Sequence, residues 1–249
     1  MRIFVITRRH LALAGLAVVL VVGVVLAGLF QSGTLSVFAP KDNIPVYSVK
    51  TDGKQIAITF DAAWGTDKTA ALLDILDKYN VKATFFVTGM WAKKNADVLA
   101  EISRRGHEIG SHGYTHKDLT TLPEAEVIDE LTKTADVIEK VTGKRPTIFR
   151  APYGAWNAKL VDIVGKEQFD FIQWDVDSLD WKGLSSEQMQ ARVLPRVVSG
   201  SITLFHNDGA HTPEVMPVIL EKLIADGYKP VTVSELLGES LEAARQAEN

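Results

Sequence analysis

Seven short apolar runs rich in β-branched and aromatic residues recur along the chain, and longer segments with helical spacing separate them. The runs cover residues 54–60, 82–87, 107–112, 146–150, 169–174, 201–206 and 229–233. Strands that alternate with helices in this way form a parallel sheet covered by helices. Seven repeats favour a closed or nearly closed barrel over an open sheet. We therefore predict an α/β fold of about seven parallel strands.

Two of the intervening segments show clear helical signals, residues 67–80 and 123–143. Pro123 suits a first helical turn, and Gly143 suits a helix end. The apolar residues of the second segment recur at steps of three or four and give one apolar face: Val127, Leu131, Ala135 and Ile138.

The N-terminus contains 20 consecutive uncharged residues, 11–30, which as a helix are long enough to cross ~30 Å of hydrocarbon. Arg8 and Arg9 directly precede this run, so residues 1–10 are expected to be cytoplasmic and the rest of the chain extracytoplasmic. The alternative is a cleaved signal peptide with "VLA" at 25–27 as its cleavage pattern, although the run exceeds the usual apolar core of such a peptide. We expect a single-pass membrane anchor, with secretion after cleavage as the alternative.

The remaining boundaries follow from composition. Residues 31–45 are small and polar with two prolines and read as a linker. Residues 46–238 form the predicted folded domain, and residues 239–249 form a polar tail to which we assign no function.

Composition excludes several classes of function. The hydrophobic share of 46% and the charged share of 23% are ordinary for a folded protein. The net charge is −4, and the first 30 residues contain three arginines and no acid, so the domain itself is more acidic still. An acidic domain argues against nucleic-acid binding. The absence of cysteine excludes thiol catalysis, disulfides and cysteine-bound zinc.

Chemically capable side chains follow five of the apolar runs: Asp61, His112, Arg150, Asp175 and His206. Each one alone reads as a helix cap or a satisfied polar group. Because the carboxyl ends of barrel strands build the active site, the five together indicate a site at that end.

His112 and His116 form an HxxxH pair, in which two imidazoles four residues apart can share one metal ion. Gly113 between them permits an unusual backbone angle, so a turn after a strand is a plausible setting. With the strand-end acid Asp61 upstream, the pair indicates a metal site.

These residues carry a resemblance to a known family. "TFDAAWG" (59–65), "SHGYTH" (111–116), "RAPYG" (150–154), "DSLDW" (177–181) and "LFH" (204–206) occur in the order and approximate spacing of five motifs of the polysaccharide deacetylase (NodB-homology, carbohydrate esterase family 4) domain. The similarity covers roughly residues 50–238 and looks closest to the PdaB-type sporulation branch. It implies a distorted (β/α) barrel that removes N-acetyl groups from chitin-like or peptidoglycan sugars with a divalent metal such as zinc.

The resemblance also implies roles for the central residues. Asp61 matches the catalytic base, and His112 and His116 match the metal-binding histidines. His206 matches the general acid that protonates the leaving sugar amine, a role that suits an imidazole near neutral pH.

Further roles follow from the same resemblance. Arg150 matches the arginine that orients the base, and Asp180 matches an acid paired with that arginine. The backbone near Tyr153 matches the oxyanion-binding turn. Trp181 and Leu204 match positions that shape the acetyl pocket.

Ala62 departs from the family pattern, because the family's first motif has a second acid there that binds the metal. Three alternatives stay open. Asp61 itself binds the ion; or Asp67 swings in, although capping the helix at 67–80 is its simpler role; or the site binds metal weakly or not at all, and the domain recognises glycan without cleaving it.

Trp64, Trp156 and Trp174 are expected to pack in the core, with stacking on sugar rings as the alternative for any that are exposed. The expected protein is thus a membrane-anchored, extracytoplasmic deacetylase-like hydrolase. Its expected partner is a cell-wall glycan, an N-acetylated amino-sugar polymer.

Overall fold

The computed structural model describes residues 44–51 and 53–238. The predicted cytoplasmic segment 1–10, the anchor 11–30, nearly all of the linker 31–45 and the tail 239–249 lie outside the described residues. Within the described ranges, no helix combines the length and the apolar character needed to span a bilayer.

The described part of the chain contains one parallel sheet of eight strands, in the order β5-β4-β3-β2-β1-β7-β6, with β8 also paired to β1. The predicted parallel α/β barrel is therefore confirmed in its main features. The additional strand is β6, which has only two residues and no apolar run of its own. The strands are β1 (Gln55–Ala62), β2 (Thr84–Val87), β3 (Glu108–Ser111), β4 (Ile148–Phe149), β5 (Asp170–Phe171), β6 (Val176–Asp177), β7 (Ile202–His206) and β8 (Lys229–Val231).

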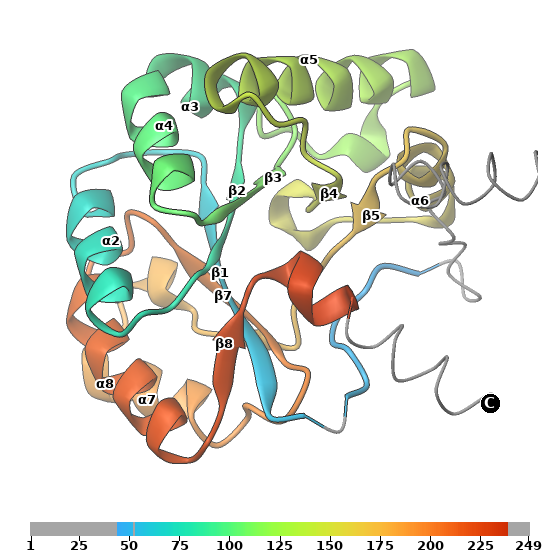
Figure 1. Cartoon of the computed structure of the whole chain (residues 1–249). Coiled ribbons are helices and arrows are strands. Elements are labelled where there is room, and N and C mark those ends of the chain that lie inside the picture. The colour runs from blue at the N-terminus through green and yellow to red at the C-terminus, as the bar shows by residue number, and fades with distance from the viewer. Residues whose placement is uncertain (1–43, 52, 239–249) are drawn as a thin grey trace, which may run out of the picture. The chain divides into compact units, whose positions relative to one another are not determined.

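Helices surround these strands (Figure 1). The predicted helix 123–143 forms, and Gly143 ends it with a φ of +74°. The predicted helix 67–80 is shorter, and its N-cap is Lys68 without a side-chain hydrogen bond, so the expected capping role of Asp67 is wrong. The helices are α2 (Thr69–Lys78), α3 (Gly89–Lys94), α4 (Ala96–Arg104), α5 (Glu124–Thr142), α6 (Ala158–Lys166), α7 (Ser186–Val193) and α8 (Thr212–Ala225), with 3-10 turns η1 (Leu119–Thr121), η2 (Pro152–Gly154) and η3 (Asp180–Lys182).

The barrel is distorted because β5 and β6, at the two ends of the strand order, are not paired with each other. The segment before β1 spans part of this gap. The Val46 N–H donates to the Phe171 carbonyl at 2.8 Å, and the Val49 N–H donates to the Gly200 carbonyl at 2.9 Å. Residues 46–49 thus link the β5 side of the barrel to the start of β7 by backbone hydrogen bonds.

The alternation of side chains along β1 decides which residues face the barrel interior. Ala57 packs in the interior apolar cluster with Phe86 and Ile148, whereas Ile58 and Ala62 pack in the outer cluster against the helices. Asp61, two pleats beyond Ala57, therefore faces the interior at the carboxyl end of the strand.

Gly110 of β3 makes room for the interior cluster beneath the site. A Cβ atom at this position would lie 2.6 Å from Cδ1 of Phe86 and 2.9 Å from Cγ1 of Ile148, closer than packed carbons tolerate. The absence of a side chain lets the Phe86 ring form the floor on which the polar residues rest.

Candidate active site

Arg150 holds Asp61 in place at the carboxyl end of the strands. Its guanidinium is fully buried, and Nη1 donates to Asp61 Oδ1 and to Thr59 Oγ1, each at 2.8 Å. Nη2 donates to the Gln173 carbonyl at 3.0 Å, and the group lies 4.1 Å from the centroid of the Phe86 ring. Burial alone would raise the pKa of Asp61, but the charge and hydrogen bond of Arg150, together with the nearby imidazoles of His112 and His206, outweigh it and hold that pKa below its usual value. Asp61 is therefore a carboxylate at neutral pH.

His112 is fixed by the same arginine. Its Nδ1 lies 2.8 Å from the Arg150 carbonyl, which can only accept, so Nδ1 carries the proton. Burial lowers the pKa of His112, which keeps the ring neutral. The unprotonated Nε2 then faces Asp61 Oδ2 at 3.5 Å. A lone pair and a carboxylate that face each other in this way can share a cation or a water molecule.

His116 completes the histidine pair, with its ring centroid 5.1 Å from that of His112. Its backbone has a φ of +61°, an unfavourable angle for a residue with a side chain. Burial lowers the pKa of His116 to about 4. Its Nδ1 is buried and has no hydrogen-bond partner among the described residues. A neutral imidazole with an unpartnered nitrogen is suited to accept an ion or a proton donor.

Glu130 fixes the turn that carries His116, and the sequence reasoning missed it. One of its carboxylate oxygens, Oε2, accepts hydrogen bonds from the backbone N–H groups of Tyr114 at 2.6 Å and Thr115 at 2.8 Å. Its other oxygen accepts from the Thr115 hydroxyl at 2.6 Å. The available signal was an acid beside Leu131, on the apolar face of the predicted helix.

Asp180 binds His206, so its predicted pairing with Arg150 is wrong. Asp180 Oδ1 lies 2.7 Å from His206 Nδ1, and Oδ2 accepts from the His206 N–H at 2.7 Å and from the Thr212 hydroxyl at 2.7 Å. The reason is topological: η3 follows β6, and β6 pairs with β7, whose last residue is His206. Arg150 is already occupied by Asp61, Thr59 and the Gln173 carbonyl.

The Asp180 carboxylate changes the titration of His206. Burial would lower the pKa of His206, but the hydrogen bond and negative charge of Asp180, together with the charges of Asp61 and Asp208, outweigh it and raise that pKa above its usual value. Asp61 and His206 are register partners on the adjacent strands β1 and β7. A carboxylate and an imidazole whose protonated form is favoured are therefore held side by side, each by its own partner.

The predicted pocket residues lie around this centre. Tyr153, in η2, is 70% exposed with a φ of +61°, and its ring centroid lies 4.7 Å from that of His116. Trp181, which follows Asp180, is 60% exposed. Leu204 is buried on β7, two residues before His206.

Two other predictions are wrong. Trp64 is 66% exposed rather than packed in the core, whereas Trp156 and Trp174 are half-buried and pack against apolar clusters. Asp175 lies at the opposite end of the barrel, because it precedes β6 rather than ending β5. There its carboxylate accepts from the Ser201 hydroxyl and from the backbone N–H that begins β7, both at 2.8 Å.

The side chains present do not make a complete three-ligand metal site. His112 and His116 supply two imidazoles, but Ala62 is buried in the outer apolar cluster and has no donor atom. Asp67 is exposed on the turn before α2. Across residues 44–51 and 53–238, no three His, Asp or Glu side chains converge closely enough to hold an ion. The donor set thus does not fit a metal that needs three protein ligands.

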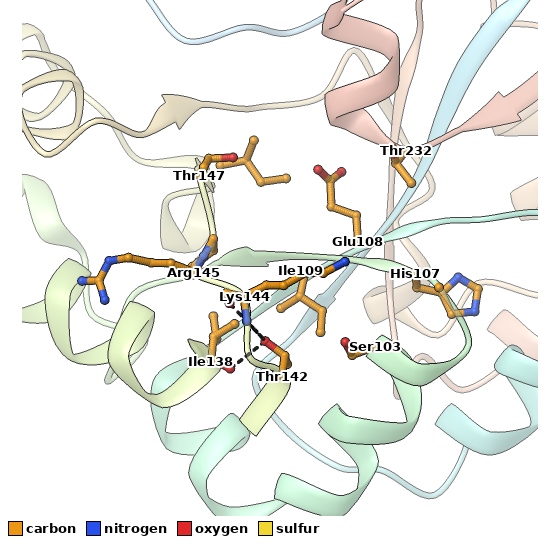
Figure 2. A pocket seen from close by; sticks show the side chains of 13 residues that line it. Ser103, His107, Glu108, Ile109, Ile138, Thr142, Lys144, Arg145, Thr147 and Thr232 are labelled. Carbon is orange, nitrogen blue, oxygen red and sulfur yellow. Dashed lines mark hydrogen bonds between the residues drawn. The ribbon is translucent and has the colours of Figure 1, made fainter. Parts of the chain in front are cut away.

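A separate hollow of about 310 Å³ lies at the other end of the strands (Figure 2). Glu108 at the start of β3, Thr147 just before β4 and Thr232 after β8 are among its lining residues. None of the residues that surround Asp61 and His206 lines it. This hollow is therefore not part of the candidate active site.

Residues 48–172 match the family model described as polysaccharide deacetylase. The chain belongs to the polysaccharide deacetylase family. It is 36% identical over 203 residues to the peptidoglycan-N-acetylglucosamine deacetylase PgdA of Listeria monocytogenes, covering 82% of this chain and 43% of PgdA. It is 33% identical to the uncharacterized protein YlxY of Bacillus subtilis, covering 79% of this chain and 61% of YlxY. The chain thus spans less than two thirds of the length of either curated relative.

A solved structure extends the family likeness to a protein without activity. BA3943 of Bacillus anthracis, described as a CE4 family pseudoenzyme, is 34% identical with a TM-score of 0.77, over 80% of this chain and 70% of that chain. A mutant of BA3943 is described as having restored enzymatic activity. The deacetylase fold therefore occurs in both active and inactive members close to this chain.

Replacing Asp180 with Asn should lower the pKa of His206, because the carboxylate that stabilises the imidazolium is lost. The histidine signals in an NMR pH titration measure this directly.

A raised folded-state pKa stabilises the protein fully below the unfolded value of about 6.5, and this stabilisation disappears as pH rises through the folded-state pKa. The stability difference between wild type and Asp180→Asn should therefore be largest at acidic pH and smaller at alkaline pH. Glu214→Gln, which removes the exposed partner of His211, serves as the control. An unchanged His206 titration in Asp180→Asn would contradict the assignment.

Proposed function

We propose that this protein is a deacetylase-like hydrolase that removes N-acetyl groups from peptidoglycan or a related amino-sugar polymer. The observation that carries the proposal is the register pairing of Asp61 with His206, each held by its own buried partner, Arg150 and Asp180. Membership of the polysaccharide deacetylase family supports the substrate class.

The residues of this chain can divide the proton transfers of amide hydrolysis between them. Asp61, an ionised carboxylate, accepts a proton from a water molecule as the water oxygen bonds to the acetyl carbon. His206, whose pKa is raised, donates its proton to the sugar nitrogen as the carbon–nitrogen bond breaks. The products are acetate and a free amino sugar. Asp61 and His206 thus hold the opposite protonation states that a base and an acid require.

A second candidate is a glycan-binding domain of the same fold without turnover. Two observations favour it: Ala62 supplies no donor where the resemblance leads us to expect a metal-binding acid, and the similar structure BA3943 is described as a pseudoenzyme. In this case the aromatic side chains around His116 would still contact a sugar polymer.

The proposed location is the outer face of the cell membrane, with residues 11–30 as a single-pass anchor. The support is the uncharged run itself and the arginines before it. The PdaB-type resemblance adds a proposed role in sporulation. N-terminal sequencing of the mature protein should find the start of the chain intact, and a mature protein that begins near Gly28 would instead indicate a cleaved signal.

The full-length protein should release acetate from N-acetylglucosamine oligomers, measured by a coupled acetate assay. Asp61→Asn and His206→Gln should each lose at least about 100-fold in rate, because each removes a group that transfers a proton. His211→Gln, which changes an exposed histidine outside the site, should keep the wild-type rate. Glycan binding by the wild type without acetate release would replace the hydrolase with the glycan-binding alternative.

Replacing Ala62 with Asp tests whether the missing donor limits ion binding. In a chelator the variant should have a lower melting temperature than the wild type, because a carboxylate enters an apolar cluster unpaired. Added zinc should raise the melting temperature of Ala62→Asp more than that of the wild type, since an ion that binds only the folded state, with the new carboxylate turned from the cluster toward His112 and His116, stabilises that state. Asp67→Asn should leave the zinc response of the wild type unchanged. Equal zinc responses in Ala62→Asp and wild type would show that position 62 does not limit ion binding.

A further inference from the structure

The three most exposed large hydrophobic side chains in the described part of the chain are all aromatic: Tyr153, Trp64 and Trp181, at 70%, 66% and 60% exposure. Each one lies just beyond the carboxyl end of a strand, after β4, β1 and β6 respectively. Large exposed aromatic side chains are unfavourable in water, so their concentration around one site indicates a binding surface.

Trp64 is presented by a turn that is fixed on both sides. The carbonyl of Gly65, the next residue, accepts a hydrogen bond from Trp91 Nε1 at 3.0 Å and another from Asn207 Nδ2 at 2.9 Å. The Asn207 backbone N–H in turn donates to the Asp61 carbonyl at 3.2 Å. The position of Trp64 is thus tied to α3 and to the residue that follows His206.

The Trp64 ring also contacts His116, one of the two paired histidines. Its centroid lies 5.7 Å from that of His116 in an edge arrangement, and Tyr153 contacts the same His116 ring. His116 separates Trp64 from His112, which faces Asp61. Trp64 is therefore two ring contacts away from His112, the histidine that faces Asp61.

We propose that Trp64 is a specificity-determining residue that stacks on the pyranose ring next to the reacting one in an N-acetylated amino-sugar polymer. The C–H face of a pyranose is apolar and matches a flat indole, whereas its hydroxyl edge stays hydrated. This inference rests on the proposed function for its substrate class, but it requires only binding and not turnover.

The test compares binding of the N-acetylglucosamine tetramer and monomer to full-length protein by calorimetry. Trp64→Ala should weaken tetramer binding roughly tenfold, since a stacked aromatic face and its buried area are lost. Its effect on the monomer should be much smaller, because the neighbouring ring is absent. Trp64→Phe should recover part of the tetramer affinity. Val198→Ala changes another exposed hydrophobic side chain, 57% exposed before the start of β7, and should bind both sugars as the wild type does.

The outcomes separate this inference from the hydrolase proposal. Tetramer binding that depends on Trp64 without acetate release would overturn the hydrolase proposal and support stacking of Trp64 on the neighbouring sugar. Equal tetramer affinity in wild type and Trp64→Ala would overturn the proposed stacking by Trp64, even if acetate is released. Equal loss for monomer and tetramer would also overturn it, because Trp64 would then act at the reacting sugar or on the fold.

Discussion

The ion pair between Arg150 and Asp61 is the interaction on which the rest of the site depends. A guanidinium buried inside a barrel would be strongly destabilising without a partner. Here the interior cluster below it supplies the Phe86 ring, and the strands beside it supply the Asp61 carboxylate, the Thr59 hydroxyl and a backbone carbonyl. The carbonyl of Arg150 itself then orients His112. One residue at the end of a two-residue strand thus sets both the charge of the base and the tautomer of the neighbouring histidine.

This arrangement separates the titration of two neighbouring groups. Asp61 and His206 are paired in register on adjacent strands, yet Arg150 lowers the pKa of the first and Asp180 raises that of the second. The two partners come from opposite directions along the sheet, Arg150 after β4 and Asp180 after β6. Because each partner is buried, neither effect is lost to solvent screening. Arg150 thereby favours the ionised carboxylate of Asp61, and Asp180 favours the protonated imidazole of His206, on neighbouring strands.

Much of this was predictable from the sequence because it depends on local periodicity. Apolar runs that alternate with helices predicted the parallel barrel, and the strand-end rule predicted that Asp61, His112, Arg150 and His206 would meet. The predictions that fail depend on how the chain is arranged in space rather than on local periodicity. Asp180 and Asp175 were misplaced because a short strand, β6, turns the chain back toward β7, and two residues carry no periodic signal. Trp64 was misassigned because an exposed tryptophan on a fixed turn has the same sequence signature as a buried one.

The loss of a donor at Ala62 affects one member of the site more than the others. Asp61, His112 and His206 are each held by protein atoms alone, so their positions do not depend on an ion. His116 differs, because its Nδ1 is buried without a hydrogen-bond partner among the described residues while Glu130 holds its turn in place. A missing third ligand therefore leaves the Arg150–Asp61 and Asp180–His206 pairs intact. His116 is then the member of the site whose ring nitrogen has no hydrogen-bond partner among the described residues. For this reason a chain of this kind can lose metal affinity without losing the geometry around Asp61 and His206.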